Sequence, residues 1–290
     1  MGNWDAIAAT IGHASQTRFE LAHAQPLSGG CINQAYRLDG TDGSHYFVKL
    51  NGAHKSSMFS AEHAGLEAIA ATRTIRVPQP ITHGTANEHA FLVLEYFDLN
   101  SNGNTRQLGE QLAALHRTQA KQFGFHRDNT LGETTQPNGW SSDWISFWRE
   151  RRLGFQLDLA ARNGYGGKLQ ALGRRLMERL PEFFDDYQPQ PSLLHGDLWG
   201  GNHAFLADGA PVIFDPAPYY GDREADLAMT ELFGGYGQDF YAAYRAAWPL
   251  DAGYATRKNL YNLYHILNHA NLFGGGYARQ AEGIMQGLLD

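Results

Sequence analysis

The chain has 290 residues, 43% of them hydrophobic, which is enough to build a sizeable core in one large domain or two smaller ones. Its 23 basic and 30 acidic side chains give a net charge of −7 without any basic run, which argues against nucleic acid or an anionic membrane as the main partner. The single cysteine excludes an intrachain disulfide, and no window has the apolar length of a membrane span. We therefore expect a cytoplasmic protein, a monomer or weak homodimer, that acts on a small or protein-bound substrate.

The first third of the chain is predicted to be rich in β-structure. A short helix is expected over residues 2–15, and a second helix over 58–72 ends before the Val-Pro-Gln-Pro stretch at 77–80. Alternating apolar residues predict strands, with a hairpin turn at 41–43. The predicted strands cover residues 19–27, 32–38, 45–50, 79–86 and 90–97. Together they indicate an antiparallel sheet that carries one inserted helix.

Helical patterns dominate the rest of the chain. A polar, turn-rich stretch over residues 98–105 is typical of a linker. A β-type interlude over 192–215 interrupts the helical part. The predicted helices cover residues 105–118, 141–163, 168–187 and about 223 to the C-terminus. A small β-rich part followed by a larger helical part is an α+β layout.

The stretch LLHGDLWGGN, residues 193–202, places a carboxylate and a carboxamide five positions apart, and a further Asp follows an apolar strand. Phosphoryl transfer needs a carboxylate to orient the attacking hydroxyl and oxygen ligands for the Mg²⁺ on the nucleotide phosphates. Asp197, Asn202 and Asp215 supply that set, and His195 is expected to support the loop. Any one of these residues fits an ordinary turn or strand end, but their order and spacing match the catalytic loop and metal-binding Asp of the protein-kinase pattern.

This match predicts a protein-kinase-like, two-lobed α+β fold. Its small antiparallel N-lobe, residues 1–97, would bind the nucleotide, and its larger helical C-lobe, residues 98–290, would carry out catalysis and bind the substrate. The chain departs from the protein-kinase pattern in having Gly196 where those enzymes keep Arg, and Asp-Pro-Ala where they keep Asp-Phe-Gly. Activation-loop phosphorylation is commonly read through that Arg, so a small-molecule kinase is the simpler interpretation.

Other parts of a nucleotide site are sought in the first 97 residues. Lys49, in the β-type run FVKL, is the expected cation for the phosphates, and its best partner is Glu62, with Glu67 on the same helix as the rival. The turn that contains Gly29 and Gly30 is the one upstream glycine turn able to cover the phosphates, although it lacks the full glycine-rich pattern.

Five further residues are interpreted from their place along the chain. Glu95, Tyr96 and Phe97 fall where the two lobes join, and backbone groups there are expected to bind the adenine edge. Asp222 is interpreted as the N-cap of a helix. Asp226 is interpreted as a buried brace hydrogen-bonded to the catalytic loop, with an exposed first-turn acid as the alternative.

Longer segments resemble the fructosamine kinase family, also called ketosamine-3-kinases, within the aminoglycoside phosphotransferase and choline kinase branch of the kinase fold. The resemblance spans about residues 20–280, and HGDLWGGN and DPAPYYGDREADLAM are its most specific parts. The segments that carry it are GGCINQAYRL, YFVKLN, MFSAEHAGLEAIA, FGFHRDNTLGETTQPNGW, PSLLHGDLWGGNHAF, PVIFDPAPYYGDREADLAMTELFGG and LYNLYHILNHANLFGGGY.

The resemblance implies ATP- and Mg²⁺-dependent phosphorylation of the 3-hydroxyl of a ketosamine, the Amadori product of a sugar and an amine. The phosphorylated adduct breaks down and releases the amine, so the reaction is a deglycation. The residue roles that it implies are as follows: Asp197 is the catalytic base, Asn202 and Asp215 are the Mg²⁺ ligands, Lys49 and Glu62 anchor the phosphates, Glu95 to Phe97 form the adenine hinge, and Trp199 faces the sugar or packs within the loop.

Several alternatives remain at this point. A related kinase for aminoglycosides, choline or homoserine would use the same residues, and a non-catalytic nucleotide-binding protein is a rival from another class. The complete set of Lys49, Asp197, Asn202 and Asp215 argues against the latter. Cys31, in the predicted phosphate turn, is either a redox switch or a small buried residue.

Overall fold

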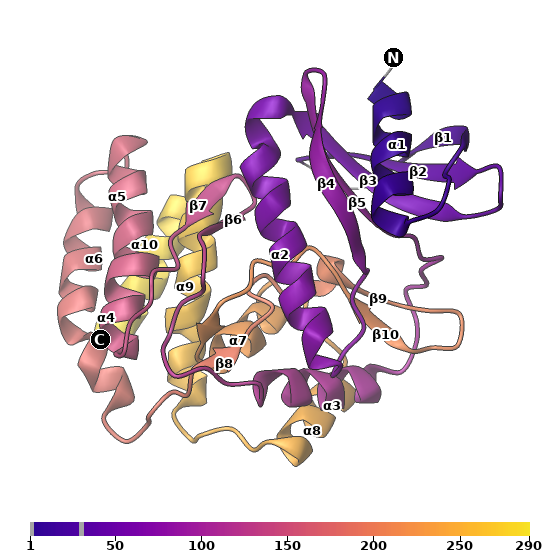
Figure 1. The fold of residues 1–290 in the computed structure, drawn as a ribbon. Helices are drawn as coiled ribbons and strands as arrows, with labels where there is room; N and C mark the ends of the chain where they lie inside the picture. The colour runs from indigo at the N-terminus through magenta and orange to yellow at the C-terminus, as the bar shows by residue number, and fades with distance from the viewer. Residues whose placement is uncertain (1–2, 29–31) are drawn as a thin grey trace. The chain divides into compact units, whose positions relative to one another are not determined.

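The computed structural model describes residues 3–28 and 32–290, which form two compact units (Figure 1). The first unit comprises residues 1–104 and 204–216, and the second comprises residues 105–203 and 217–290. Gly29, Gly30 and Cys31 lie outside the described residues, so the phosphate turn and the redox switch stay predictions. The nucleotide-binding and catalytic roles of the two predicted lobes also stay predictions.

An antiparallel sheet of five strands forms the first unit, in the order β1-β2-β3-β5-β4. The turn at 41–43 joins β2 to β3, and the Gly40 N–H donates to the Ser44 carbonyl 2.8 Å away. Each predicted strand and the predicted hairpin are therefore confirmed. The strands are β1 Leu21–Leu27, β2 Gln34–Gly40, β3 His45–Gly52, β4 Pro80–Ala86 and β5 His89–Glu95.

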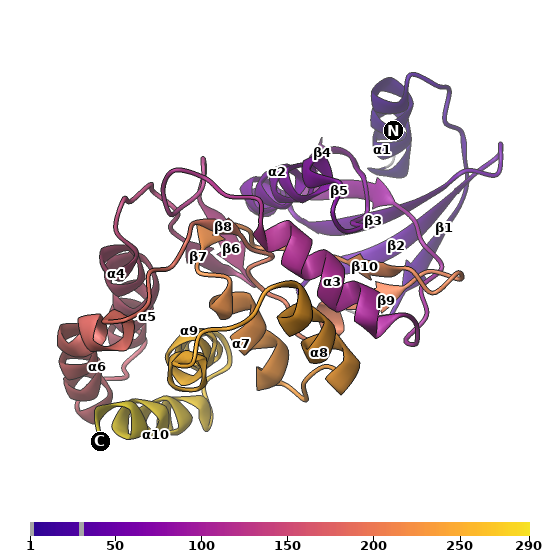
Figure 2. The same cartoon turned by 90° about the horizontal axis from the view of Figure 1, so that it is seen from below.

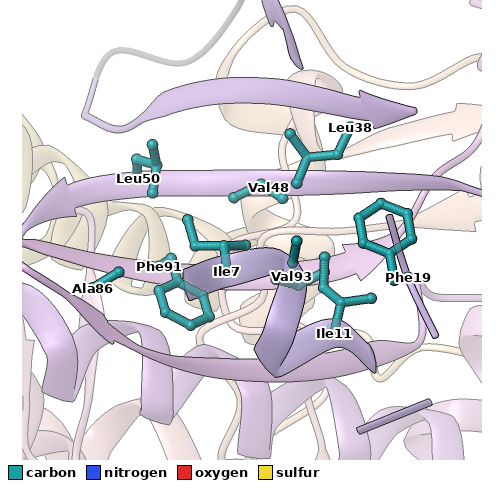
Figure 3. Packing of buried hydrophobic residues seen from close by; sticks show 10 residues of the cluster. Ile7, Ile11, Phe19, Leu38, Val48, Leu50, Ala86, Phe91 and Val93 are labelled. Carbon is teal, nitrogen blue, oxygen red and sulfur yellow. The ribbon is translucent and has the colours of Figure 1, made fainter. Parts of the chain in front are cut away.

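Two helices pack against this sheet, and side-chain alternation places them on opposite faces. From α1, Asn3–Ser15, the side chains of Ile7 and Ile11 pack into a cluster with Val48 of β3 (Figure 3). Lys49 is the next residue along β3, so its side chain points to the other face. There it meets α2, Ser56–Thr72, which follows the 3₁₀ turn Ala53–Lys55. Both predicted helices are confirmed.

The remaining chain is mainly helical, as expected, with short β-pairs between the helices. Strand β6 pairs with β7, β8 with β11, and β9 with β10. A π-helical segment, Trp148–Gly154, joins α4 to α5 and was not foreseen, nor was the β6–β7 hairpin. The elements are α3 Thr105–His116, β6 Asn129–Leu131, β7 Thr134–Gln136, α4 Trp144–Phe147, α5 Phe155–Arg162, α6 Lys168–Arg179, a 3₁₀ turn Leu180–Phe184, β8 Ser192–Leu193, a 3₁₀ turn Gly200–Asn202, β9 His203–Phe205, β10 Pro211–Ile213, β11 Tyr220–Gly221, α7 Glu224–Leu232, α8 Gln238–Ala247, α9 Tyr254–Phe273 and α10 Tyr277–Leu289.

Helix α9 is the centre of the second unit and is buried along most of its length. It packs against α7 and α10, while α3 lies alongside α8 (Figure 2). The ring of Trp148 meets the ring of Tyr261 edge-on at 4.9 Å between centroids, so the π-helical segment contributes to this core. Within the described residues, none of the helices combines the length and apolar character needed to cross a membrane.

Candidate active site

Lys49 is the centre of a buried charge cluster in the first unit. Its Nζ donates to Glu62 Oε1 at 2.6 Å and to Asp215 Oδ1 at 2.7 Å, and only 6% of the residue is exposed. Burial alone would lower the pKa of Lys49, but the two carboxylates outweigh it and raise the pKa above its ordinary value. The ammonium is therefore charged and held in one position.

The structure decides between the two candidate partners of Lys49 on α2. Glu62 makes the ion pair, whereas Glu67 points away, with 62% of its side chain exposed and its carboxylate 3.5 Å from the ring of His63. Burial raises the pKa of Glu62; Lys49 opposes this shift and the nearby Asp215 carboxylate adds to it. Two carboxylates share one ammonium, so the cluster favours the approach of a further cation.

Asp215 follows β10 in an unusual backbone conformation. Its φ of +58° lies in the left-handed region, which few residues other than glycine adopt and which concentrates at functional sites. The strand before it is fixed because the Ile213 N–H donates to the Arg76 carbonyl 3.0 Å away. Oδ1 of Asp215 faces Lys49, while its side chain is 47% exposed. This conformation aims the carboxylate at the lysine and leaves it open to a ligand.

The three predicted hinge residues are the last residue of β5 and the two after it, and their side chains are engaged locally. Glu95 accepts hydrogen bonds from Arg76 Nη2 at 2.5 Å and from the Gln79 N–H at 3.2 Å. The guanidinium of Arg76 lies 5.1 Å from the ring centroid of Phe97, and the Tyr96 hydroxyl donates to Asp98. These contacts engage the three side chains, and the Glu95 N–H donates to the Gln79 carbonyl at 2.9 Å. Binding of the adenine edge by the hinge backbone stays a prediction.

In the second unit, Asp226 holds the loop that carries His195, Gly196 and Asp197. Its Oδ2 accepts the His195 N–H at 2.7 Å and its Oδ1 accepts the Gly196 N–H at 2.8 Å. Asp226 is 1% exposed. Burial raises its pKa, but the contact with His116 and the other donors outweighs burial, so that the pKa lies below its ordinary value. Asp226 is therefore the buried brace that the sequence predicts, and not an exposed acid.

His116 of α3 completes this brace and was missed by the sequence reasoning. Its Nε2 lies 3.1 Å from Asp226 Oδ2 and its Nδ1 lies 2.8 Å from the hydroxyl of Tyr244 on α8. The imidazole is fully buried. The only signal in the sequence is a His at the end of an apolar helix face, which does not identify its partners.

Asp222 lies just before α7 and makes the bond expected of a capping side chain. Helix α7 begins at Glu224, and Asp222 accepts the N–H of that residue, two positions on, at 3.0 Å. Its carboxylate is fully buried and also accepts hydrogen bonds from the hydroxyls of Tyr187, at 2.9 Å, and Tyr261, at 2.5 Å. Asp222 thus supports the start of α7 and joins it to α9.

Asn202 fastens the predicted catalytic carboxylate from its own loop. Its Nδ2 donates to the Asp197 carbonyl at 2.8 Å and lies 3.4 Å from Asp197 Oδ2. Asp197 also places its N–H 3.3 Å from His195 Nδ1. The Trp199 side chain, on the same loop, is one of the few large apolar groups left exposed, at 41%. The loop therefore presents an ordered carboxylate beside an open aromatic ring.

Gly196 explains the departure from the Arg of protein kinases. Its φ is +84°, and a Cβ at this position would lie 2.0 Å from the Ala217 carbonyl oxygen. That carbonyl cannot withdraw, because Ala217 is tied to the loop through its N–H bond to the His195 carbonyl at 2.9 Å. No side chain fits here, so the loop is built for glycine.

We expect Gly196→Ala to lower the free energy of unfolding by about 3 kcal/mol, since the substitution combines backbone strain with a steric clash. Urea unfolding followed by circular dichroism measures this. Gly200→Ala is the matched control in the same loop, because its φ is not positive and an added Cβ meets no atom within 4 Å. Equal stability of the two variants would contradict the expectation.

The first unit has a small antiparallel sheet with a Lys–Glu–Asp cluster, and the helical second unit carries an H-x-D-x₄-N loop held by Asp226. Together these features define a phosphotransferase of the kinase fold. The crystal structure of a protein described as "Putative fructosamine-3-kinase" from Haemophilus somnus matches this chain with a TM-score of 0.90 and 30% identity, over 99% of this chain and 98% of that one. The predicted α+β, kinase-like fold class is confirmed.

The family described as "Fructosamine kinase" matches residues 3–290. A "Probable ketoamine kinase" of Synechocystis sp. is 49% identical over 99% of this chain and 97% of its own length. The chloroplastic protein-ribulosamine 3-kinase of Arabidopsis thaliana is 46% identical over 91% of this chain and 81% of its own. The chain belongs to the fructosamine kinase family, as its motifs predict.

Proposed function

We propose that the chain transfers the γ-phosphoryl group of ATP to the 3-hydroxyl of a ketosamine, and so acts in the deglycation of amines. One observation carries the proposal: a chain similar over nine-tenths or more of its length to ketoamine and ribulosamine kinases has the charged cluster of phosphoryl transfer, with Lys49 bonded to both Glu62 and Asp215. A scaffold that only binds nucleotide would not need this cluster intact.

In the proposed mechanism, Asp197 accepts a hydrogen bond from the 3-hydroxyl of the sugar and takes its proton as the oxygen attacks phosphorus. Asn202 fixes the backbone of Asp197 through its amide, so the carboxylate is positioned before the substrate arrives. Lys49 binds oxygen atoms of the nucleotide phosphates, and Glu62 keeps its ammonium in place. Catalysis then comes mainly from positioning and from charge neutralisation.

Asn202 and Asp215 each carry a side-chain oxygen of the kind that binds Mg²⁺. Asn202 donates with Nδ2, and among the described residues its Oδ1 accepts no hydrogen bond. Asp215 uses Oδ1 for Lys49 and keeps a half-exposed carboxylate. Mg²⁺ takes one or two protein oxygens and completes its shell with phosphates and water. We propose Asn202 and Asp215 as its ligands; when bound, the ion neutralises charge on the phosphates.

A substrate panel tests the proposal. The protein is incubated with MgATP and fructoselysine, ribuloselysine, choline, homoserine or an aminoglycoside, and the products are analysed by ³¹P NMR and mass spectrometry. We expect phosphate to appear on the ketosamines, at the 3-position. Phosphate on one of the other alcohols alone would assign a related small-molecule kinase. Absence of ATP turnover with the whole panel would leave only a nucleotide-binding protein.

A matched pair of substitutions tests the phosphate-anchoring role. We expect Glu62→Gln to raise the KM for ATP by about tenfold. The Lys49 ammonium would then pair with one carboxylate instead of two, so it would be less well positioned for the phosphates. Glu67→Gln, five residues along the same helix, removes an exposed carboxylate and should change that KM by less than about twofold. Steady-state kinetics with varied ATP measures both. Equal KM values would remove Glu62 from the nucleotide site.

A further inference from the structure

The turn that carries Asn202 has little rigidity of its own. It runs from Trp199 through Gly200 and Gly201, and glycine gives the backbone the most conformational freedom. Its backbone bonds are the Asn202 N–H to the Trp199 carbonyl, at 3.0 Å, and the Trp199 N–H to the Asp197 carbonyl, at 3.1 Å, and the Asn202 side chain adds its bond to the Asp197 carbonyl at 2.8 Å. A turn with two glycines and so few bonds depends on support from outside it.

Tyr236 provides that support at both ends of the turn. Its hydroxyl donates to the Trp199 carbonyl at 3.1 Å. Its ring stacks on the imidazole of His203, the residue after Asn202, with 4.4 Å between centroids and 27° between planes. One side chain therefore contacts the residues on either side of the 3₁₀ turn, Gly200–Asn202, although it is more than thirty positions away in the sequence.

The phenol is itself held as a donor in a fixed place. The Tyr236 N–H donates to the hydroxyl of Tyr241 at 3.0 Å, and its ring packs on Phe240 with 4.7 Å between centroids. Burial, together with the charges of Asp226 and Asp197, holds the pKa of Tyr236 well above its ordinary value, so the hydroxyl keeps its proton. Gly234 and Gly235 before it have φ of +99° and +73°, which lets the segment after α7 turn back to the loop.

We propose that Tyr236 is a positioning residue of this enzyme: it fixes the turn between Trp199 and His203 and, through it, the orientation of Asn202 and Trp199. It acts by limiting the motion of the turn. The inference rests on the proposed function for its effect on turnover, but its structural part does not. The proposal gives a structural role to the GGYG segment, residues 234–237.

The test compares Tyr236→Phe with Tyr254→Phe. The first removes one hydroxyl and keeps the ring on His203; the second also removes a hydroxyl, the one bonded to Glu231 at 2.6 Å at the start of α9, away from the loop. Amide hydrogen exchange should quicken about fivefold at Asn202 in Tyr236→Phe, as expected for one lost hydrogen bond, and stay unchanged in Tyr254→Phe. With a ketosamine, kcat should fall about fivefold in Tyr236→Phe while the KM for ATP stays within about twofold.

Tyr236→Leu, which removes the stacking as well, should enlarge both effects. Unchanged exchange at Asn202 in Tyr236→Phe and Tyr236→Leu would overturn the proposal whatever the substrate proves to be. Quickened exchange with unchanged kcat would also overturn it, because the turn would then not limit catalysis. If the wild-type protein phosphorylates no ketosamine, the exchange measurement still decides the positioning part, so failure of the proposed function is recognised separately.

Discussion

Asp197→Asn is expected to lower kcat for ketosamine phosphorylation by about 10³-fold, because the carboxamide cannot accept the proton of the attacking hydroxyl. The loop should keep its shape, since Asn202 bonds mainly to the Asp197 backbone carbonyl and Asp226 holds the neighbouring amides. ATP affinity should therefore change by less than about threefold. Single-turnover kinetics measures the first effect and isothermal titration calorimetry measures the second.

Asp158→Asn makes the same chemical change at an exposed position on α5 and serves as the control. We expect it to match the wild-type protein in both measurements. Wild-type turnover by Asp197→Asn would show that another group, or the substrate itself, takes the proton. Loss of both ATP binding and turnover would instead indicate that the substitution had disrupted the fold around the loop. An unchanged circular dichroism spectrum would exclude that cause.

The sheet was predictable because its signal is local. In β3, Val48 and Leu50 alternate with Lys49, and this pattern alone places the lysine opposite the core of α1. The kinase spacing likewise needed only one stretch of chain, residues 195–215. The β1–β2, β2–β3 and β4–β5 pairings and the Lys49–Glu62 contact join neighbouring elements, whereas β3 pairs with β5 across α2 and β4.

The supports of the loop were not predictable, because they join elements far apart in the sequence. His116 lies 110 residues from Asp226 and 128 from Tyr244. Nothing in the sequence near His116 or Tyr244 differs from an ordinary amphipathic helix. The π-helical segment is similar: Trp148 and Arg152 are buried there by packing against α9 and the loops, and no propensity favours that geometry.

The position of Asp226 was nonetheless predicted correctly, and the reason is instructive. It lies in the first turn of α7, where the helix dipole alone would favour an acid, yet its neighbours in the run EADLAM are apolar. An acid within an apolar run must be paired when buried, so a partner on the adjacent loop was the consistent reading. An acid in the first turn of a helix can be favoured by the helix dipole or by buried hydrogen-bond partners. Asp239 allows the two to be compared, because it occupies the first turn of α8 and is exposed.

Asp226→Asn is expected to lower the free energy of unfolding by about 3 kcal/mol and to reduce kcat. The carboxylate faces donors on both oxygens: the Gly196 N–H on Oδ1, and the His195 N–H and the His116 ring on Oδ2. A carboxamide must place its own N–H₂ against one of these donors, which breaks at least one bond in a dry environment. Asp239→Asn should cost less than about 0.5 kcal/mol, since only a dipole interaction is lost there.

The difference between Asp226→Asn and the wild-type protein should depend on pH in one direction. Because the pKa of Asp226 is lower in the folded protein than in the unfolded chain, the stability that it contributes is complete above the unfolded pKa of about 4 and is lost as the pH falls through the folded value. Urea unfolding between pH 7 and pH 3 should therefore show the two proteins converging at low pH. A constant difference would mean that the carboxylate charge does not hold the loop and that His116 and the shape of the site suffice without it.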